Sequence, residues 1–581
     1  MKWRFIIIIL FLSLALRLYG INADLPNTYW HDENNYVETA LRFGTGNLKP
    51  HTLQHGMLLP LILFAEYGAY YVKEKLTVDG YTPTDFLAEY VANPGPFYLL
   101  SRITVMLFGL GSILFVYLIA IKLYNKRVAN ISSLFFSFSL VPFIQSKWTK
   151  ASAISVFFLL LALLTLIPII ANSRREKKSL LGRYVASGFF VGLASAAKLY
   201  SVFGFTFILL THLFACRGNK ERFFGRNLIL SGTCLLLGFA LGNPYAVVNP
   251  KFFLIGLTQM HGELFDATVT SPWLLYFKNH LKNVLGSRPL EVLILISCIF
   301  FVVKRSKKEM ILLAYPVTLF LLYLRYSGLT HYLIPAVPFL VIIAGAFLDT
   351  VLKKASYSKA ATFAVAVVIF VAVLPCFANI LRYDVLISKP DTRTIAREWI
   401  EKNIPANSSI LSEGYILTMP VQVPQLKSNT ETLKRDLAMV REKGGRGALV
   451  GTEIEYAEKD KRNKRYDIYK TSIMDSDMLK KSKTDFVILS GYVEIDSGER
   501  EYLRGKDFYK ERNKLYASLE EKYRLVKVFI PYPELGNNFP VLLTEDFRKL
   551  KSINPLRDTS RLLRGPKIKI YRRKNIQDDA K

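Results

Sequence analysis

The chain contains a series of apolar runs, each near the length that crosses the ~30 Å hydrocarbon core of a bilayer. Eleven spans are predicted, near residues 5–20, 98–121, 128–146, 151–171, 184–197, 199–215, 228–247, 289–303, 310–325, 332–348 and 360–381. Hydrophobic residues make up 51% of the 581 residues, which excludes a disordered chain, a collagen and a coiled coil. The pattern predicts an α-helical polytopic membrane protein over residues 1–381.

The basic excess of the chain is unevenly distributed. The sequence has 76 Lys and Arg against 46 Asp and Glu, a net charge of +30. Residues 1–381 hold 35 basic and 16 acidic side chains. This segment is therefore poor in acids rather than dense in bases, as membrane proteins are. The four cysteines show no metal-binding spacing, and a disulfide framework is not expected.

Loop charges give the predicted orientation, because cytoplasmic loops of membrane proteins are enriched in Lys and Arg. Five basic clusters fall on one side of the predicted arrangement, at 122–127, 174–183, 217–226, 304–308 and 353–359. Lys2 and Arg4 lie on the same side as these clusters only if the apolar stretch 55–72 does not cross the membrane. We therefore interpret 55–72 as an interfacial or re-entrant helix. The N-terminus is then on the cytoplasmic side of the cell membrane. The outer loops 21–97 and 248–288 and everything after residue 381 lie outside.

Residues 382–581 differ in composition from residues 1–381. Their pattern predicts a C-terminal extracytoplasmic α/β domain. Helix-like segments near 391–402, 431–442 and 507–522 alternate with strand-like segments near 408–412, 485–491, 523–530 and 566–571. The Lys/Arg-rich stretches of this part are interpreted as solvated faces or contacts with membrane lipids. Nucleic acid is not expected as a partner outside the cell membrane.

Acidic residues are concentrated in the first outer loop, where nine of the sixteen acids of residues 1–381 fall between Asp24 and Glu89. Asp32 and Glu33 come soon after the first span. Adjacent carboxylates close to an apolar slab are costly when they lose water, so they need either hydration or a function. A hydrated loop pair is the simple alternative to a catalytic pair.

Several segments resemble the GT-C membrane glycosyltransferases, in particular the protein O-mannosyltransferase-like family (glycosyltransferase family 39) and its relatives that add aminoarabinose to lipid A. Asp32-Glu33 after the first span, followed by Gly44–His51, looks like the first outer loop of this group. Further similar segments are Ser101-Arg102, Gly192–Ser201, Gly242–Pro250, Arg325, His331–Leu340, Asp391–Ile410 and Gly565–Arg573. The resemblance covers most of the chain and implies the GT-C fold.

The resemblance also implies transfer of a sugar from a polyprenyl or dolichyl phosphate to a glycan, lipid or protein acceptor at the outer face of the membrane. A lipid phosphate is a competent leaving group, whereas the acceptor hydroxyl needs a base, for which Asp32 is the candidate. One base without a covalent nucleophile predicts inversion. Glu33 would orient the acceptor or join Asp32 in holding a divalent metal, Mg²⁺ or Mn²⁺.

Fixed cations are expected beside the departing phosphate, because negative charge develops on it. The candidates near the outer boundary of the spans are Lys198, Arg325, His331 and Arg102. Candidates for acceptor contact are His55 beside the 55–72 segment and His261, Glu263 and Asp266 in loop 248–288. We otherwise expect loop 248–288 to be hydrated and without regular structure.

Other functions compete with this interpretation. An oligosaccharyltransferase is disfavoured because its Trp-Trp-Asp signature is missing: the five tryptophans are Trp3, Trp30, Trp148, Trp273 and Trp399. A transporter or flippase of lipid-linked sugar would be expected to have ionisable residues deep in the spans and two repeated halves. The sequence has few acidic residues deep in the spans and shows no repeat. A non-catalytic membrane scaffold that presents the tail is a third alternative.

Overall fold

The computed structural model describes residues 3–574 except 30, 51–55, 171–179, 217–224, 266–280, 324–329, 417–418, 421–422, 444–446, 461, 472–473, 491–512 and 532–562. The side chains of residues 31, 216, 259–265, 323, 330, 415–416, 419–420 and 441–443 are also outside the description. Among the sequence candidates, Arg325, His55 and Asp266 therefore lie outside the described residues, and His261 and Glu263 are placed only as members of a helix.

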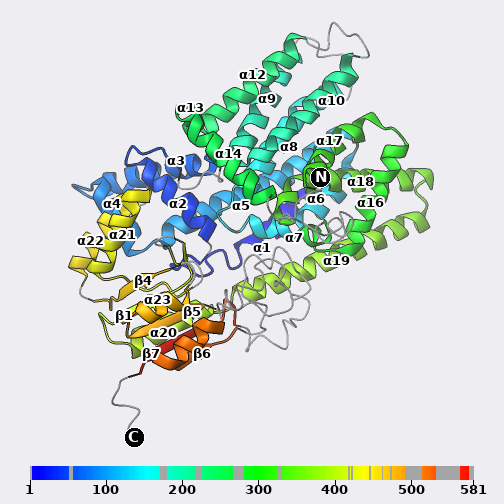
Figure 1. The fold of residues 1–581 in the computed structure, drawn as a ribbon. Coiled ribbons are helices and arrows are strands. Elements are labelled where there is room, and N and C mark those ends of the chain that lie inside the picture. Colours follow the sequence, from blue (N-terminus) through cyan, green and yellow to red (C-terminus); the bar gives the residue numbers. More distant parts are fainter. Residues whose placement is uncertain are drawn as a thin grey trace.

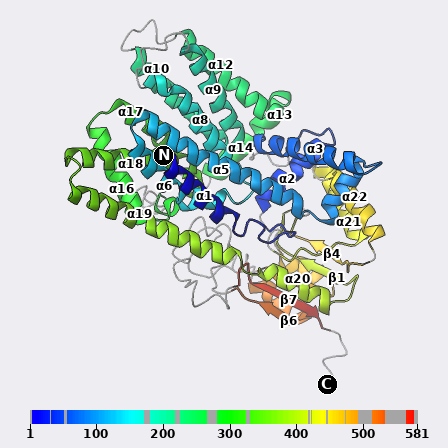
Figure 2. The ribbon, with the colours of Figure 1, turned by 180° about the vertical axis from the view of Figure 1, so that it is seen from behind.

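The chain has a helical part followed by a smaller part built on a β-sheet (Figures 1 and 2). The helices of the first part are α1 (Arg4–Leu18), α2 (His31–Phe43), α3 (Leu58–Thr77), α4 (Pro83–Ala92), α5 (Gly95–Leu123), α6 (Lys126–Ser137), α7 (Leu140–Gln145), α8 (Ser152–Ile170), α9 (Leu180–Ala197), η2 (Leu199–Gly204), α10 (Phe205–Cys216), α12 (Arg226–Gly242), α13 (Pro244–Val248), α14 (Pro250–Phe265), α16 (Arg288–Val303), α17 (Lys307–Tyr323), η3 (Thr330–Ala336), α18 (Val337–Lys354) and α19 (Lys359–Ile387). α19 runs toward the sheet and ends at Ile387, beyond the predicted domain boundary at 381 (Figure 1).

Five helical segments in the described part of the chain are long and apolar enough to cross a membrane. They are Gly95–Leu123, Ser152–Ile170, Leu180–Ala197, His331–Lys354 and Lys359–Ile387, and two shorter apolar helices are Leu199–Ala215 and Arg226–Gly242. The chain is therefore a multi-pass membrane protein. The count of eleven spans stays a prediction, and α3, which contains most of the stretch 55–72, is not among the five.

Three details of the predicted helical part are wrong. The span 128–146 divides into α6 and α7, because Ser139 between them is extended (φ −62°, ψ 122°). The span 228–247 ends at Gly242, because Pro244 disfavours the helical conformation of the residue before it. Residues 250–265 form α14 instead of an irregular loop.

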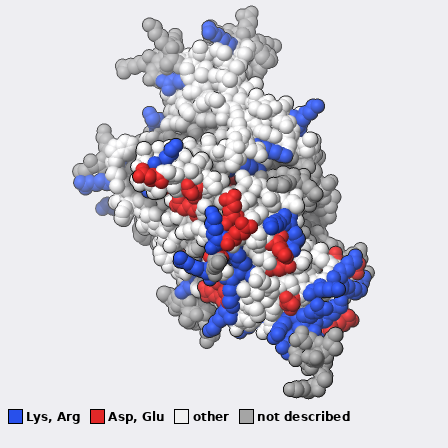
Figure 3. Space-filling model, turned by 90° about the vertical axis from the view of Figure 1, so that its left-hand side faces the viewer, with Lys and Arg blue, Asp and Glu red and all other residues white. Residues whose placement is uncertain are grey.

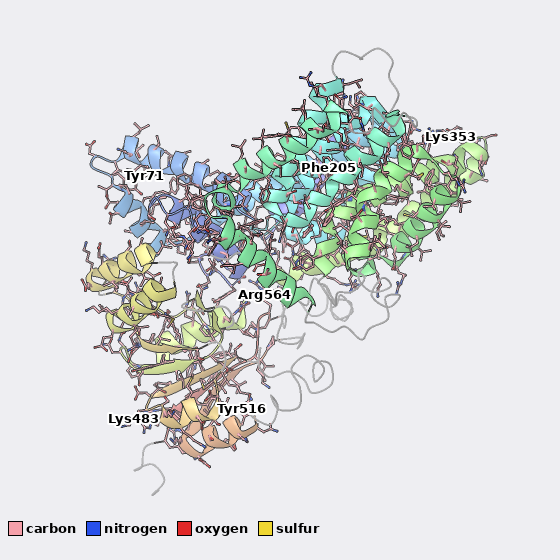
Figure 4. All side chains as sticks on the ribbon, turned by 45° about the horizontal axis from the view of Figure 1, so that its top comes forward. Tyr71, Phe205, Lys353, Lys483, Tyr516 and Arg564 are labelled. Atoms are coloured by element: carbon pink, nitrogen blue, oxygen red, sulfur yellow. The ribbon has the colours of Figure 1, made fainter. Side chains whose placement is uncertain are left out.

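Turns that carry three of the basic clusters meet at one end of the helical part. Asp349 accepts a hydrogen bond from Arg127 at 2.8 Å and forms an ion pair with Lys353 at 2.8 Å. Tyr124 donates to Glu309 at 2.7 Å. Figure 4 shows Lys353 at the end of the helices far from the sheet. This grouping fits the predicted common side of these turns, and the assignment of that side to the cytoplasm stays a prediction.

The C-terminal part contains a five-stranded sheet in the order β4-β1-β5-β7-β6. Its strands are β1 (Ser409–Ser412), β4 (Asp467–Lys470), β5 (Phe486–Ser490), β6 (Tyr523–Phe529) and β7 (Ile568–Arg573), and β2 (Tyr415–Ile416) pairs separately with β3 (Met419–Pro420). β4, β1 and β5 are parallel, and β7 is antiparallel to β5 and β6. Parallel strands need crossovers, which α21 (Thr430–Lys443), α22 (Gly447–Lys459) and α23 (Ser476–Lys481) supply.

Alternate residues of β5 face two separate cores, as the two-residue period of a strand requires. Phe486 and Ile488 pack in the cluster that includes α20 (Thr392–Asn403), whereas Val487 and Leu489 pack on the opposite face. The sheet is therefore buried on both sides.

The C-terminal part contacts the first outer loop just before α2. Arg564 forms an ion pair with Asp24, donating from Nη1 at 2.8 Å. Gln425 accepts from the backbone nitrogen of Thr28 at 3.1 Å and donates to its carbonyl at 2.9 Å. Figure 4 shows Arg564 between the sheet and the helices, and Figure 3 shows charged residues gathered on the lower part of the molecule, below a largely uncharged helical surface. Residues 24–29 are thereby held by the tail.

Helices α9 and α12 pack with their backbones almost touching. A Cβ atom at Gly188 would lie 2.0 Å from the carbonyl oxygen of Ser231, and one at Gly192 would lie 2.2 Å from that of Leu235. Residues four apart share a helix face, and small residues at this spacing allow close packing of membrane helices. The two glycines therefore set the distance between α9 and α12.

We predict that Gly192→Ala destabilises the protein by about 1–3 kcal/mol, because the added methyl group must push α12 away. A thermal melt of the purified protein in detergent should show a lower melting temperature. Gly182→Ala is the matched control on α9, since nothing lies within 4 Å of its added Cβ atom. Equal melting temperatures for the two variants would contradict the packing argument.

Candidate active site

A buried ion pair joins α2 to α5. Arg102 donates from Nε to Oε1 of Glu33 at 2.9 Å and from Nη2 to Oε2 at 2.7 Å, and both side chains are fully buried. Nη1 donates to the carbonyls of Ile21 and Ala23, each at 2.9 Å, and the guanidinium lies 4.4 Å from the ring centroid of Trp148. A two-pronged pair with its remaining donors satisfied is the arrangement in which buried charges are tolerated.

The loop 146–151 between α7 and α8 is fixed from two sides. Lys147 donates to Asp384 of α19 at 2.5 Å and to a carbonyl at the end of α1 at 2.6 Å. The backbone nitrogen of Thr149 donates to Oε1 of Glu33 at 2.8 Å. These contacts hold the segment that ends in Lys150.

Four polar side chains from four separate segments lie near one another beside this loop. Asp32, in the first turn of α2, forms an ion pair with Lys150. Lys198, between α9 and η2, interacts electrostatically with both of them, and His331 in η3 interacts with all three. The Asp32 side chain is 24% exposed, whereas that of Glu33 is fully buried. Of the two adjacent carboxylates, Asp32 is therefore the one that a ligand can reach.

The environment of Lys198 suits an anion. Burial and, to a smaller extent, the nearby positive charge of Lys150 lower the pKa of Lys198 to about 8, although the carboxylate of Asp32 opposes the shift. A buried amine beside a second amine is stabilised in its charged form when a negative ligand arrives. The arrangement can therefore hold a phosphate between two lysines.

The structure thus brings together Asp32, Lys198 and His331, three of the residues that the sequence analysis proposed. Arg102 is engaged by Glu33 and backbone carbonyls, which supports a positioning role rather than phosphate contact. The sequence analysis missed Lys150.

A signal for Lys150 was present in the sequence. Lys147 and Lys150 lie in the short turn between the predicted spans 128–146 and 151–171, on the side opposite to the basic clusters. The positive-inside rule does not account for lysines on that side. Two lysines there therefore needed another explanation, which the ion pairs of this loop provide.

A divalent metal held by Asp32 and Glu33 stays a prediction, and in this structure other groups engage both carboxylates. Both oxygens of Glu33 accept hydrogen bonds from Arg102, and Oε1 also accepts from Thr149. Asp32 is paired with Lys150. Among the described residues, no group of three or more His, Cys, Asp or Glu is arranged to hold a metal ion.

Solved structures share this fold at low sequence identity. ArnT from Cupriavidus metallidurans bound to undecaprenyl phosphate matches with a TM-score of 0.50 and 12% identity, over 90% of this chain and 96% of that one. The oligosaccharyltransferase AglB from Archaeoglobus fulgidus, in complex with an inhibitory peptide and a dolichol-phosphate, matches with a TM-score of 0.51 and 13% identity, over 98% and 88%. The Archaeoglobus fulgidus oligosaccharyltransferase in complex with Zn and sulfate matches with a TM-score of 0.50 and 14% identity, over 98% of this chain and 88% of that one.

No protein-family model matches the chain, and no curated protein matches it significantly. The structural matches extend over both the helical part and most of the tail. The chain therefore has the GT-C fold, as the resemblance implied.

We predict that neutralising Glu33 destabilises the protein, whereas neutralising its neighbour Asp32 does not. Glu33→Gln removes one charge of a buried pair, which costs about 3–5 kcal/mol, and should lower the melting temperature clearly. Asp32→Asn changes a partly exposed ion pair worth about 0–1 kcal/mol and should melt close to the wild type. Thermal melts of both variants in the same detergent test this, and a stable Glu33→Gln variant would refute the structural role of Glu33.

Proposed function

We propose that this protein is a glycosyltransferase that moves a sugar from a polyprenyl- or dolichyl-phosphate donor to a hydroxyl group of an acceptor at the extracytoplasmic face. The observation that carries the proposal is the meeting of one reachable carboxylate, Asp32, with Lys150, Lys198 and His331. Proteins of the same fold include one bound to undecaprenyl phosphate and one bound to a dolichol-phosphate, which supports a lipid-phosphate donor here.

In this proposal Asp32 is the general base. The acceptor oxygen forms a bond to the anomeric carbon while the bond from that carbon to the phosphate oxygen breaks. The electron pair of the broken bond leaves with the lipid phosphate, and the acceptor proton passes to the carboxylate of Asp32. A single displacement of this kind inverts the anomeric configuration.

Lys150 and Lys198 bind the phosphate of the donor. Their charges are fixed in place before the reaction, so they stabilise the developing negative charge with little reorganisation. In the free protein Lys150 is paired with Asp32. A phosphate competes for Lys150, and its binding releases Asp32 for the acceptor hydroxyl. Donor binding thereby prepares the base.

Glu33 and Arg102 act as positioning residues. Their buried pair fixes the start of α2 against α5, and the same carboxylate holds the loop that carries Lys150 through Thr149. Displacement of either segment by 1 Å would separate the base from the phosphate site, and misplacement on this scale can cost about 10²-fold in rate.

We predict that Asp32→Asn lowers sugar transfer by at least about 10²-fold, because the acceptor proton loses its base. Transfer from a radiolabelled polyprenyl-phosphate sugar to an endogenous acceptor in membranes measures this. Asp79→Asn, an exposed acid of the same outer loop, is the control and should retain wild-type transfer. Unchanged turnover in Asp32→Asn would end the catalytic assignment, and sugar that crosses the membrane without transfer would favour the transporter alternative.

We also predict a pH dependence of donor-phosphate binding. The pKa of Lys198 is lowered to about 8, so this amine loses its proton as the pH rises through that value. Affinity for undecaprenyl phosphate should therefore fall as the pH is raised from about 7 to about 9. Lys198→Arg stays charged across this range and should show a flatter profile in a nanodisc binding assay. Identical pH profiles for the two proteins would exclude Lys198 from the phosphate site.

A further inference from the structure

A polar cavity of about 240 Å³ lies between the first outer loop and the C-terminal part. Asn34 and Glu38 of α2 and Tyr90 of α4 line it from one side, and α21, α22 and the segment before them line it from the other. Its lining does not include Asp32, Lys150, Lys198 or His331. Because a helix turns by about 100° per residue, Asn34 and Glu38 point about 160° and 120° away from Asp32 on the same helix.

The side chains that line this cavity carry charges of both signs. Three acids and three bases contribute to the wall: Glu38, Asp436, Glu453, Lys427, Arg465 and Lys470. Lys470 and Asp436 form an ion pair at 2.5 Å, and Lys427 and Arg465 both lie within 4.0 Å of Asp460. An anion or a cation that enters would meet charges of both signs. A neutral ligand with many hydroxyl groups can instead donate to carboxylates and accept from the basic groups, without the cost of burying a net charge.

Aromatic rings complete the lining. Tyr90 packs edge-on against Phe97, with ring centroids 5.3 Å apart, and its hydroxyl lies 3.3 Å from that of Tyr98. Tyr456 of α22 lines the opposite wall. Tyrosine combines an apolar ring with a polar hydroxyl, which suits a ligand that has apolar C–H faces and polar edges, as a pyranose does.

The size of the cavity limits what it holds. Drug-sized sites measure about 300–1,000 Å³, so a cavity of 240 Å³ accommodates one or two sugar rings rather than a long chain. We propose that this cavity binds a neutral saccharide, which forms the non-reacting part of the acceptor. Its assignment to the acceptor rests on the proposed function, whereas the binding of a neutral saccharide rests on the cavity alone. α2 then contacts the donor site on one face and the acceptor on another.

Isothermal titration calorimetry of the full-length protein in nanodiscs tests the proposal. The neutral probes are cellobiose, maltose, lactose, chitobiose and mannobiose, and the charged probes are glucose 6-phosphate and glucosamine. At least one neutral disaccharide should bind, and more tightly than either charged probe. Glu453→Gln and Tyr456→Ala should each weaken that binding at least tenfold. Glu455→Gln is the matched control, because Glu455 is exposed on α22 and does not line the cavity.

Three results would overturn the proposal: no binding by any of the five disaccharides, tighter binding of a charged probe, or equal affinity in the wild type and both cavity variants. The Asp32→Asn variant should bind the disaccharide as the wild type does, because Asp32 lies on another face of α2. If sugar transfer survives Asp32→Asn while saccharide binding depends on Glu453, the proposed function fails and the saccharide site stands.

Discussion

The fully buried pair of Glu33 and Arg102 is the interaction on which the arrangement of the site depends. Charges removed from water are stable only when their partners are in place, and here two parallel hydrogen bonds, two backbone carbonyls and the ring of Trp148 satisfy the arginine. The pair fixes α2 relative to α5. One residue before it, Asp32 is turned by about 100° and meets the loop lysine instead of the arginine. Adjacent carboxylates therefore take two different roles.

In the loop between α7 and α8, two lysines likewise have different partners. Lys147 points to Asp384 and to the end of α1, where it ties three segments together. Lys150, three residues later, reaches Asp32. In both cases a buried, paired charge holds the backbone. The nearby charge of the same sign, Asp32 or Lys150, pairs with the other in the structure and is the one that meets a ligand in the proposed mechanism. A site of this kind is prepared before the substrate arrives, because the cost of ordering it is met during folding.

The sequence predicted the parts of this fold that depend on hydropathy and period. The strand-like segments near 408–412, 485–491, 523–530 and 566–571 correspond to β1, β5, β6 and β7. β4 was missed because Asp467–Lys470 is short and carries charges at both ends. The break at Ser139 was missed because a hydropathy window averages over one extended residue. The partner of Arg102 was equally out of reach: an arginine near the membrane boundary can pair with a protein carboxylate or with a phosphate, and only tertiary structure distinguishes the two.

The C-terminal part contributes to the position of α2, which carries Asp32. Residues 24–29 precede α2 in the sequence, and they are held by Arg564 through Asp24 and by Gln425 through Thr28. α2 is thus fixed at its start by the tail and along one face by Arg102. A 13-residue helix has little stability of its own in water, so its position depends on these contacts. Because the same tail forms the far wall of the polar cavity, any ligand held there contacts α2 and the tail together, on a helix whose other face carries Asp32.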